Sequence, residues 1–296
     1  MESTISLPRE SVVCDMCQVD NAQCLCEAQS LYSEERFRLV QCRRCSLIYV
    51  NPRQEELAKR AQLSSASRGT EQYESDSARD RPVNRAILEA IGRFQRPGRL
   101  LDVGCATGGL LREALACGWE VAGVEISPAS AEVARQTYGL DVRTGTLDEV
   151  RWPEQTFDAV TMIHTIEHVY QPSQVVAEVF RILKPGGVFY CQTPDFHHYA
   201  TRVAHYFGLM KDSDPIDPTG HPYHFTPKTL SRVVQRQGFR ILRCGSPMTG
   251  FFAERNGHRP RWQTTFLKSA ALPAIWVSQI VPIGSVIECI AQRPIE

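Results

Sequence analysis

Runs of hydrophobic residues alternate with amphipathic stretches over most of the chain after residue 80. Short segments that contain clusters of apolar residues predict strands at residues 99–104, 119–125, 140–144, 157–163, 187–193, 238–244 and 285–292. Between them, apolar residues recur at helical spacing over residues 82–94, 108–117, 128–137, 173–183 and 227–237. Strands that alternate with helices in this way predict an α/β domain built on a parallel sheet.

The pattern divides the chain into three parts. Residues 1–53 form a short, cysteine-bearing segment that ends on the strand-like "SLIYVNPR". Residues 54–80 are polar and rich in Ser, Glu and Arg, which predicts a linker or a loose helix. Residues 81–296 form the α/β domain, with an expected lid insertion at about 246–283. One helix has clear boundaries, since Thr226 precedes Pro227 at its start and Gly238 follows its end.

Composition narrows the classes of partner. Lysine and arginine together number 33, as do aspartate and glutamate, so the formal net charge is zero and no strong field favours nucleic acid or an anionic membrane. The N-terminus "MESTISLPRE" lacks the apolar core of a secretory signal, and no apolar run reaches about 18 residues. We therefore expect a cytoplasmic location, where the paired cysteines among the eleven in the chain indicate metal binding more than disulfides.

One stretch, "RLLDVGCATGGLLREALACGWEVAGVEIS", combines a strand, a glycine turn, a helix and a second strand that ends on an acid. The turn has no Lys followed by Ser or Thr, which excludes a Walker loop. It matches the dinucleotide fingerprint imperfectly, because with Gly104 as the first position the third position is Ala106 and not glycine. Glu125 is placed to bind the ribose of any adenosine ligand. Asp102, just before the turn, suits a ligand that carries an ammonium group.

The segments that follow the turn favour a ligand that carries an ammonium group over a dinucleotide. "TGTLDEV", "FDAVTMIHTIEHV", "QVVAEVFRILKPGGVFYCQTP" and "HPYHFTPKTLSRVVQRQGFRIL" occur in this order. Together they resemble the class I S-adenosylmethionine-dependent methyltransferases, over about residues 80–245. The resemblance implies a Rossmann-like, seven-stranded, mostly parallel sheet with helices on both faces, and S-adenosyl-L-methionine as cofactor. A Rossmann-like domain that has lost its ligand is the alternative.

The resemblance also assigns cofactor-binding residues. Asp102, Gly104 and Gly108 would surround the methionine portion, with the small Cys105 allowing close approach. Glu125 would bind the ribose and Ile126 the adenine. Thr146 and Leu147 would border the adenine edge, and Ile163 and His164 would lie beside the sulfonium.

Two Cys-x-x-Cys pairs stand in the N-terminal segment. Cys14, Cys17, Cys42 and Cys45 have the spacing of a zinc ribbon, in which four thiolates surround a tetrahedral ion. The second pair and "SLIYVNPR" resemble the end of ribbons fused ahead of certain methyltransferases. Either cysteine of "CLC", residues 24–26, could replace one ligand, and four unligated cysteines are the alternative.

The histidines offer candidates for proton transfer. "HTIEH", residues 164–168, matches an inverted zinc-protease pattern that works only on a helix, whereas here it ends a strand. Ubiquinone-pathway O-methyltransferases carry E-x-x-E-H here and bind a divalent metal. His164 replaces their first Glu, so a second metal site stays open. His224 and His168 are the candidate bases, since a hydroxyl or carbon acceptor must lose a proton. A purely structural histidine is the alternative for each.

Three functions follow from these patterns. The first is methyl transfer to a small-molecule acceptor, for example a sugar or natural-product intermediate. The second is a zinc-ribbon RNA methyltransferase, against which the balanced charge counts. The third is a non-catalytic zinc-binding adaptor. The apolar C-terminal stretch, interrupted by Pro273 and Pro282, predicts a lid or a peripheral contact with a membrane.

Overall fold

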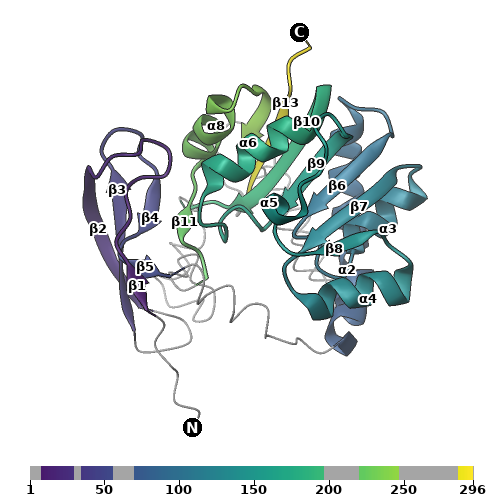
Figure 1. Cartoon of the computed structure of the whole chain (residues 1–296), viewed down its shortest axis with the longest axis horizontal. Helices are drawn as coiled ribbons and strands as arrows, with labels where there is room; N and C mark the ends of the chain where they lie inside the picture. The colour runs from purple at the N-terminus through teal and green to yellow at the C-terminus, as the bar shows by residue number, and fades with distance from the viewer. Residues whose placement is uncertain (1–7, 30–34, 56–69, 197–219, 247–285, 296) are drawn as a thin grey trace, which may run out of the picture.

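Two sheets lie side by side in the molecule, a small one built mainly from the N-terminal segment and a larger one that carries the helices (Figure 1). The structure is a computed structural model. It describes residues 8–29, 35–55, 70–196, 220–246 and 286–295.

The larger sheet has seven strands in the order β12-β13-β10-β9-β6-β7-β8. Its strands are β6 (Arg99–Val103), β7 (Glu120–Glu125), β8 (Val142–Thr144), β9 (Phe157–Ile163), β10 (Leu183–Pro194), β12 (Arg240–Gly245) and β13 (Val286–Gln292). Only β13 runs antiparallel to its neighbours. The predicted seven-stranded, mostly parallel sheet is confirmed. Its central strands are buried along most of their length, which explains why most of their residues are apolar.

Helices cover both faces of this sheet, as predicted. They are α2 (Thr70–Gly92), α3 (Gly109–Ala116), α4 (Pro128–Tyr138), α5 (Leu147–Val150), α6 (Pro172–Ile182) and α8 (Pro227–Arg236). The first begins at Thr70 and not at residue 82, because its polar first turns carry no apolar stripe that a periodicity could reveal. The four-residue α5 is too short to produce a periodic signal.

The ends of α8 agree with the sequence prediction. The Thr226 side chain accepts a hydrogen bond from the Thr229 backbone N–H at 3.2 Å, and Pro227 occupies the first helical position. Gly238 follows the helix with φ of +95°, a conformation that favours glycine.

The small sheet combines distant parts of the chain. Its strands β2 (Ala22–Gln29), β3 (Arg36–Cys42) and β4 (Ile48–Val50) come from the N-terminal segment, and β11 (Tyr223–His224) pairs with β4. A further pair joins β1 (Arg9–Glu10) to β5 (Arg53–Gln54). Residues of the N-terminal segment, such as Leu47 and Tyr49, also share one hydrophobic cluster with α6 and α8. The N-terminal segment therefore packs as part of the same body as the larger domain.

Three sequence expectations are only partly covered by the structure. Most of the predicted linker, the predicted lid and most of the apolar C-terminal stretch lie outside the described residues. Among the helices that are described, none has the length and apolar character needed to span a membrane. The cytoplasmic location stays a prediction.

Candidate functional site

A tight turn connects β6 to α3 at the carboxyl edge of the sheet. The backbone N–H groups of Gly104 and Cys105 donate to the carbonyl of Val124, at 2.8 and 3.2 Å, so the turn is held against β7. Gly104 has φ of +79°, and a Cβ added there would lie 2.5 Å from Oγ1 of Thr165. Glycine is therefore required at this position both by backbone conformation and by space.

Glu125 closes the turn from the end of β7. Its carboxylate accepts hydrogen bonds from the backbone N–H of Ala106 at 2.9 Å and of Ser127 at 2.8 Å. The residue is 9% exposed. Each carboxylate oxygen has a further acceptor position beyond these bonds, so the group can still receive hydroxyl donors from a ligand.

Asp102 lies beneath the same turn and is buried. Burial, together with the charge of Glu125, raises its pKa to about 7, although the hydrogen bond donated by Thr161 at 2.7 Å acts in the opposite direction. A buried carboxyl of this kind gains by receiving a cationic ligand.

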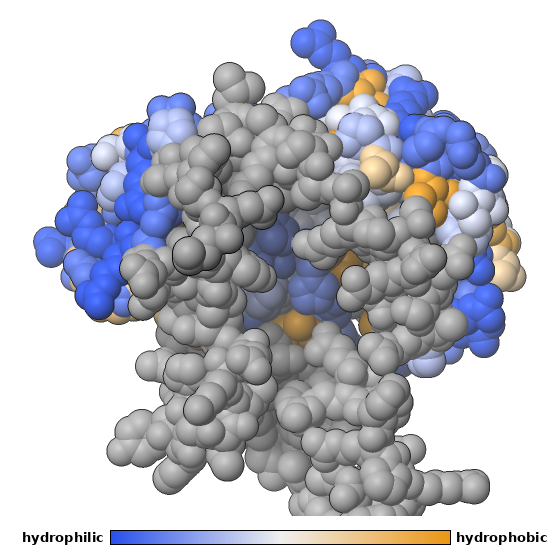
Figure 2. Space-filling model, turned by 90° about the horizontal axis from the view of Figure 1, so that it is seen from below, coloured by the Kyte–Doolittle hydropathy of each residue, from blue (hydrophilic) through white to orange (hydrophobic). Residues whose placement is uncertain are grey.

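A cavity of about 680 Å³ opens beside the turn. Gly104, Ile126, Thr146 and Leu147 line it, together with His168. Residues of α6 and of the loop before it form the opposite wall. Figure 2 looks at the molecule from below, toward the carboxyl edge of the parallel strands, where described hydrophilic and hydrophobic residues are visible near the centre. Four predicted cofactor residues thus meet at one cavity.

The other predicted cofactor residues lie around the turn without lining this cavity. The Cys105 thiol packs in the core covered by α2, α3 and α4, where it occupies the space above Gly123. Gly108 has φ of +83° and faces Leu140. Ile163 packs against the same core, while the His164 side chain is 42% exposed.

Thr165 is a site residue that sequence reasoning missed. Its hydroxyl lies within hydrogen-bonding distance of the carbonyls of Val103, at 3.1 Å, and Ile163, at 3.0 Å. It therefore ties the ends of β6 and β9 together directly under Gly104. Its place two residues after the end of a buried strand was a usable signal, because ligands bind at the carboxyl ends of parallel strands.

Glu167, His168 and His221 form a polar group next to the cavity, with ligand atoms that all lie within 4.8 Å of one another. Burial raises the pKa of Glu167, but the hydrogen bond from His164 and the charge of His168 outweigh it and hold the pKa below its ordinary value. Thr193 also donates to the Glu167 carboxylate at 2.8 Å. This donor set could bind a divalent cation.

The two candidate bases occupy different environments. His168 is exposed and lines the cavity, and its Nδ1 lies 2.7 Å from the carbonyl oxygen of Gly220. His224 is 5% exposed and sits on β11, paired with Ile48. The ring centroid of His221 lies 4.7 Å from that of His168 and 6.1 Å from that of His224. The histidines therefore form one row that begins at the cavity.

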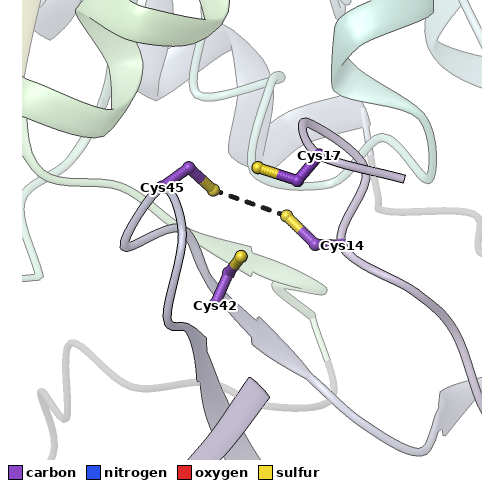
Figure 3. Close-up of side chains that lie close together, drawn as sticks. All are labelled: Cys14, Cys17, Cys42 and Cys45. Carbon is purple, nitrogen blue, oxygen red and sulfur yellow. Dashed lines mark hydrogen bonds between the residues drawn. The ribbon is translucent and has the colours of Figure 1, made fainter. Parts of the chain in front are cut away.

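Four cysteines meet in the N-terminal segment, as the spacing predicted. The sulfur atoms of Cys14, Cys17, Cys42 and Cys45 all lie within 4.8 Å of one another and point to a common centre (Figure 3). Burial raises the pKa of Cys45 to about 11. Four convergent thiols on two tight turns fit a tetrahedral zinc ion. The exposed cysteines of β2 lie outside this cluster.

Comparison with known proteins agrees with this geometry. A family model described as a methyltransferase domain matches residues 75–243, more than half of the chain. A ubiquinone biosynthesis O-methyltransferase from Hahella chejuensis is 40% identical over 121 residues, which cover 38% of this chain and 50% of that protein. One from Xanthomonas oryzae pv. oryzae is 38% identical over 103 residues, which cover 32% and 42%. The chain spans about half the length, or less, of the curated relatives it matches.

The fold has counterparts among solved structures. The crystal structure of a SAM-dependent methyltransferase from Archaeoglobus fulgidus superposes with a TM-score of 0.52 and 18% identity, covering 72% of this chain and 94% of that one. At this identity the likeness concerns the fold alone. The family match carries the assignment, and by it the chain belongs to the S-adenosylmethionine-dependent methyltransferases of class I fold.

Proposed function

We propose that this chain transfers a methyl group from S-adenosyl-L-methionine to a small-molecule acceptor. The observation that carries the proposal is the pair of carboxyl groups, Asp102 and Glu125, that flank the glycine turn beside the cavity. The turn lacks the Lys followed by Ser or Thr of a phosphate-binding loop, and two carboxyl groups lie next to it. This combination suits a ligand that presents an ammonium group and ribose hydroxyls.

This placement of the two carboxyl groups suggests how each part of S-adenosylmethionine, the methyl donor, would be bound. Glu125 would accept the ribose hydroxyls, and Asp102, Gly104, Cys105 and Gly108 would surround the methionine portion. The adenine would lie against Ile126, with Thr146 and Leu147 at its edge. Ile163 and His164, at the end of β9, would lie beside the sulfonium.

Chemistry at the acceptor requires alignment and, for a hydroxyl or an acidic carbon, removal of a proton. The sulfonium is already activated, so the protein mainly has to orient the acceptor and exclude water. The carbonyl of Gly220 can only accept a hydrogen bond, so Nδ1 of His168 carries the proton there and Nε2 is left as an acceptor. This tautomer makes His168 the better placed base, with His224 second.

A bound divalent cation at Glu167, His168 and His221 is the alternative role for the same side chains. Such an ion would lower the pKa of an acceptor hydroxyl that it bound. Dependence of turnover on added magnesium or manganese after treatment with a chelator distinguishes this role from that of a free base.

The cysteine cluster would hold one structural zinc ion. Its four sulfur donors match the ligand set of closed structural sites, which leave no position for a substrate. The N-terminal segment would then contribute stability and shape, with no chemical step of its own.

The names of the relatives support an oxygen acceptor on a small molecule, because several are ubiquinone biosynthesis O-methyltransferases. The decisive experiment supplies methyl-labelled S-adenosylmethionine together with a small-metabolite extract or with total RNA. We expect label in the small-metabolite fraction. Label in RNA would favour the zinc-ribbon RNA methyltransferase, and no transfer to either would favour the non-catalytic adaptor.

A further inference from the structure

Asp15 connects the cysteine cluster to the larger domain. It lies between Cys14 and Cys17, inside the first cysteine turn, and it is buried. Its Oδ2 accepts a hydrogen bond from the backbone N–H of Ser173 at 2.9 Å, in the first turn of α6. The residue at the N-cap of that helix, Gln171, makes no side-chain capping bond. Asp15 therefore caps α6 from a distant part of the chain.

The helix that Asp15 caps forms one wall of the cavity. Gln174, Val175 and Glu178 of α6 line the space opposite the glycine turn, as do Tyr170 and Gln171 just before the helix. A shift at the start of α6 would therefore move this wall relative to the ligand-binding turn.

Arg53 holds the same wall at a second point. Its guanidinium is buried, donates to the carbonyl of Tyr170 at 2.9 Å and lies 4.4 Å from the centre of the Tyr170 ring. It also donates to the hydroxyl of Tyr223, the first residue of β11, at 3.2 Å. The N-terminal segment thus contacts both the wall of the cavity and the strand that carries His224.

Each of the two cysteine turns is also tied to α8. The Arg232 side chain donates to the carbonyl of Cys45 at 2.9 Å, and Arg236 donates to the carbonyl of Met16. The backbone of the turns is therefore part of the packing surface between the small sheet and the helices. A metal ion that binds all four sulfurs would fix the two turns relative to each other, and with them the position of Asp15.

We propose that Asp15 is a positioning residue that couples metal binding at the cysteine cluster to ligand affinity at the cavity. The inference rests on the proposed function, because the ligand is the methyl donor. Coupling of this kind is reciprocal: the metal raises the affinity for the donor, and the donor raises the affinity for the metal by the same factor. The contact Asp15–Ser173 carries the effect to α6.

The test compares Asp15→Ala with Asp15→Asn in zinc-loaded protein. Alanine removes the acceptor for Ser173, whereas asparagine keeps an oxygen there and should restore binding. Asp20→Ala is the matched control, since Asp20 is an exposed acid that follows the same cysteine turn. Calorimetric titration with S-adenosylhomocysteine should show Kd raised about five- to tenfold in Asp15→Ala, within the range expected for loss of a cap. The zinc content should stay at one ion per chain.

Two further measurements use the wild-type chain. Removal of zinc by a chelator should raise Kd for S-adenosylhomocysteine by at least the same factor and should speed amide exchange at Ser173. Competition with a chelator should show tighter zinc binding when S-adenosylhomocysteine is present. Unchanged ligand affinity after both zinc removal and Asp15→Ala would overturn the coupling.

Failure of the proposed function would give a different result. In that case zinc-loaded wild-type protein would not bind S-adenosylhomocysteine at all, and the proposed coupling between zinc and this ligand would be wrong as well. Amide exchange at Ser173 separates the two outcomes, because it reports the Asp15 cap without any ligand. Exchange at Ser173 that is the same in wild type, Asp15→Ala and zinc-free protein would show that the cap itself does not exist.

Discussion

The backbone N–H of Ala106 donates to the carboxylate of Glu125 at 2.9 Å, across the gap between the glycine turn and the end of β7. Ala106 itself has φ of +48°, a conformation that favours glycine. The bond thus stabilises an unfavourable backbone conformation and places a carboxylate beside the cavity at the same time. The fold of the turn and the chemistry of the site depend on one side chain.

Gly104 provides a test of the turn. Gly104→Ala should lower the free energy of unfolding by about 2–4 kcal/mol, because it combines backbone strain with a clash against Thr165. Gly118→Ala is the matched control: Gly118 has φ of +85°, yet a Cβ there meets no atom within 4 Å. It should cost about 1 kcal/mol from strain alone. Equal losses in denaturant titrations would show that the turn tolerates a side chain.

Asp102 predicts a pH dependence of donor binding. Its pKa of about 7 in the free protein is raised by burial, so the carboxyl is mostly neutral below that pH. A ligand ammonium favours the charged form, so binding near pH 6 should release a proton and affinity should rise as the pH increases through 7. Calorimetry in buffers with different ionisation enthalpies measures this release. Asp102→Asn should abolish it, and an unchanged release in that variant would assign the proton to another group.

The cysteine cluster predicts one zinc ion per chain. Elemental analysis of protein purified without a chelator should find it, and the variant Cys14→Ser with Cys42→Ser should lose it. The variant Cys24→Ser with Cys26→Ser is the control, because both residues lie on the exposed strand β2 outside the cluster. Loss of zinc in the control alone would mean that the ligand set differs from the four convergent sulfurs.

The row of histidines predicts a base at the cavity. His168→Ala should lower turnover by roughly 10²–10⁴ while leaving affinity for the donor nearly unchanged. The loss should shrink at high pH, where a hydroxyl acceptor ionises without help. His224→Ala should have a smaller effect on turnover, since that ring is buried on β11. Near-normal turnover in both variants at neutral pH would show that neither histidine is the base. Catalysis would then consist of aligning the acceptor with the methyl donor.

Much of the larger domain could be predicted because its strands are buried on both faces. Strand β9, for example, has mostly apolar residues, and its predicted bounds, 157–163, agree with the structure. The helix start at Thr226 was readable from its cap and from Pro227. The convergence of the four cysteines was readable from their spacing.

Contacts between distant segments could not be predicted in this way. Nothing local in the sequence indicates that His224 and Ile48 are paired on adjacent strands, since a two-residue strand has no periodicity. The cap that Asp15 provides for α6 joins positions 158 residues apart, and neither position alone suggests the other. Such contacts come from tertiary packing, and they give the wall of the cavity its shape.

Binding of the methyl donor tests the central claim most directly. Calorimetric titration of the purified protein should show S-adenosylmethionine and S-adenosylhomocysteine binding and NAD failing to bind. Glu125→Ala should weaken that binding by about 2–4 kcal/mol through loss of charge-assisted hydrogen bonds. Glu120→Gln, an exposed acid at the opposite end of β7, should leave it unchanged. Equal affinity for NAD, or no loss in Glu125→Ala, would contradict the assignment of this turn to the methyl donor.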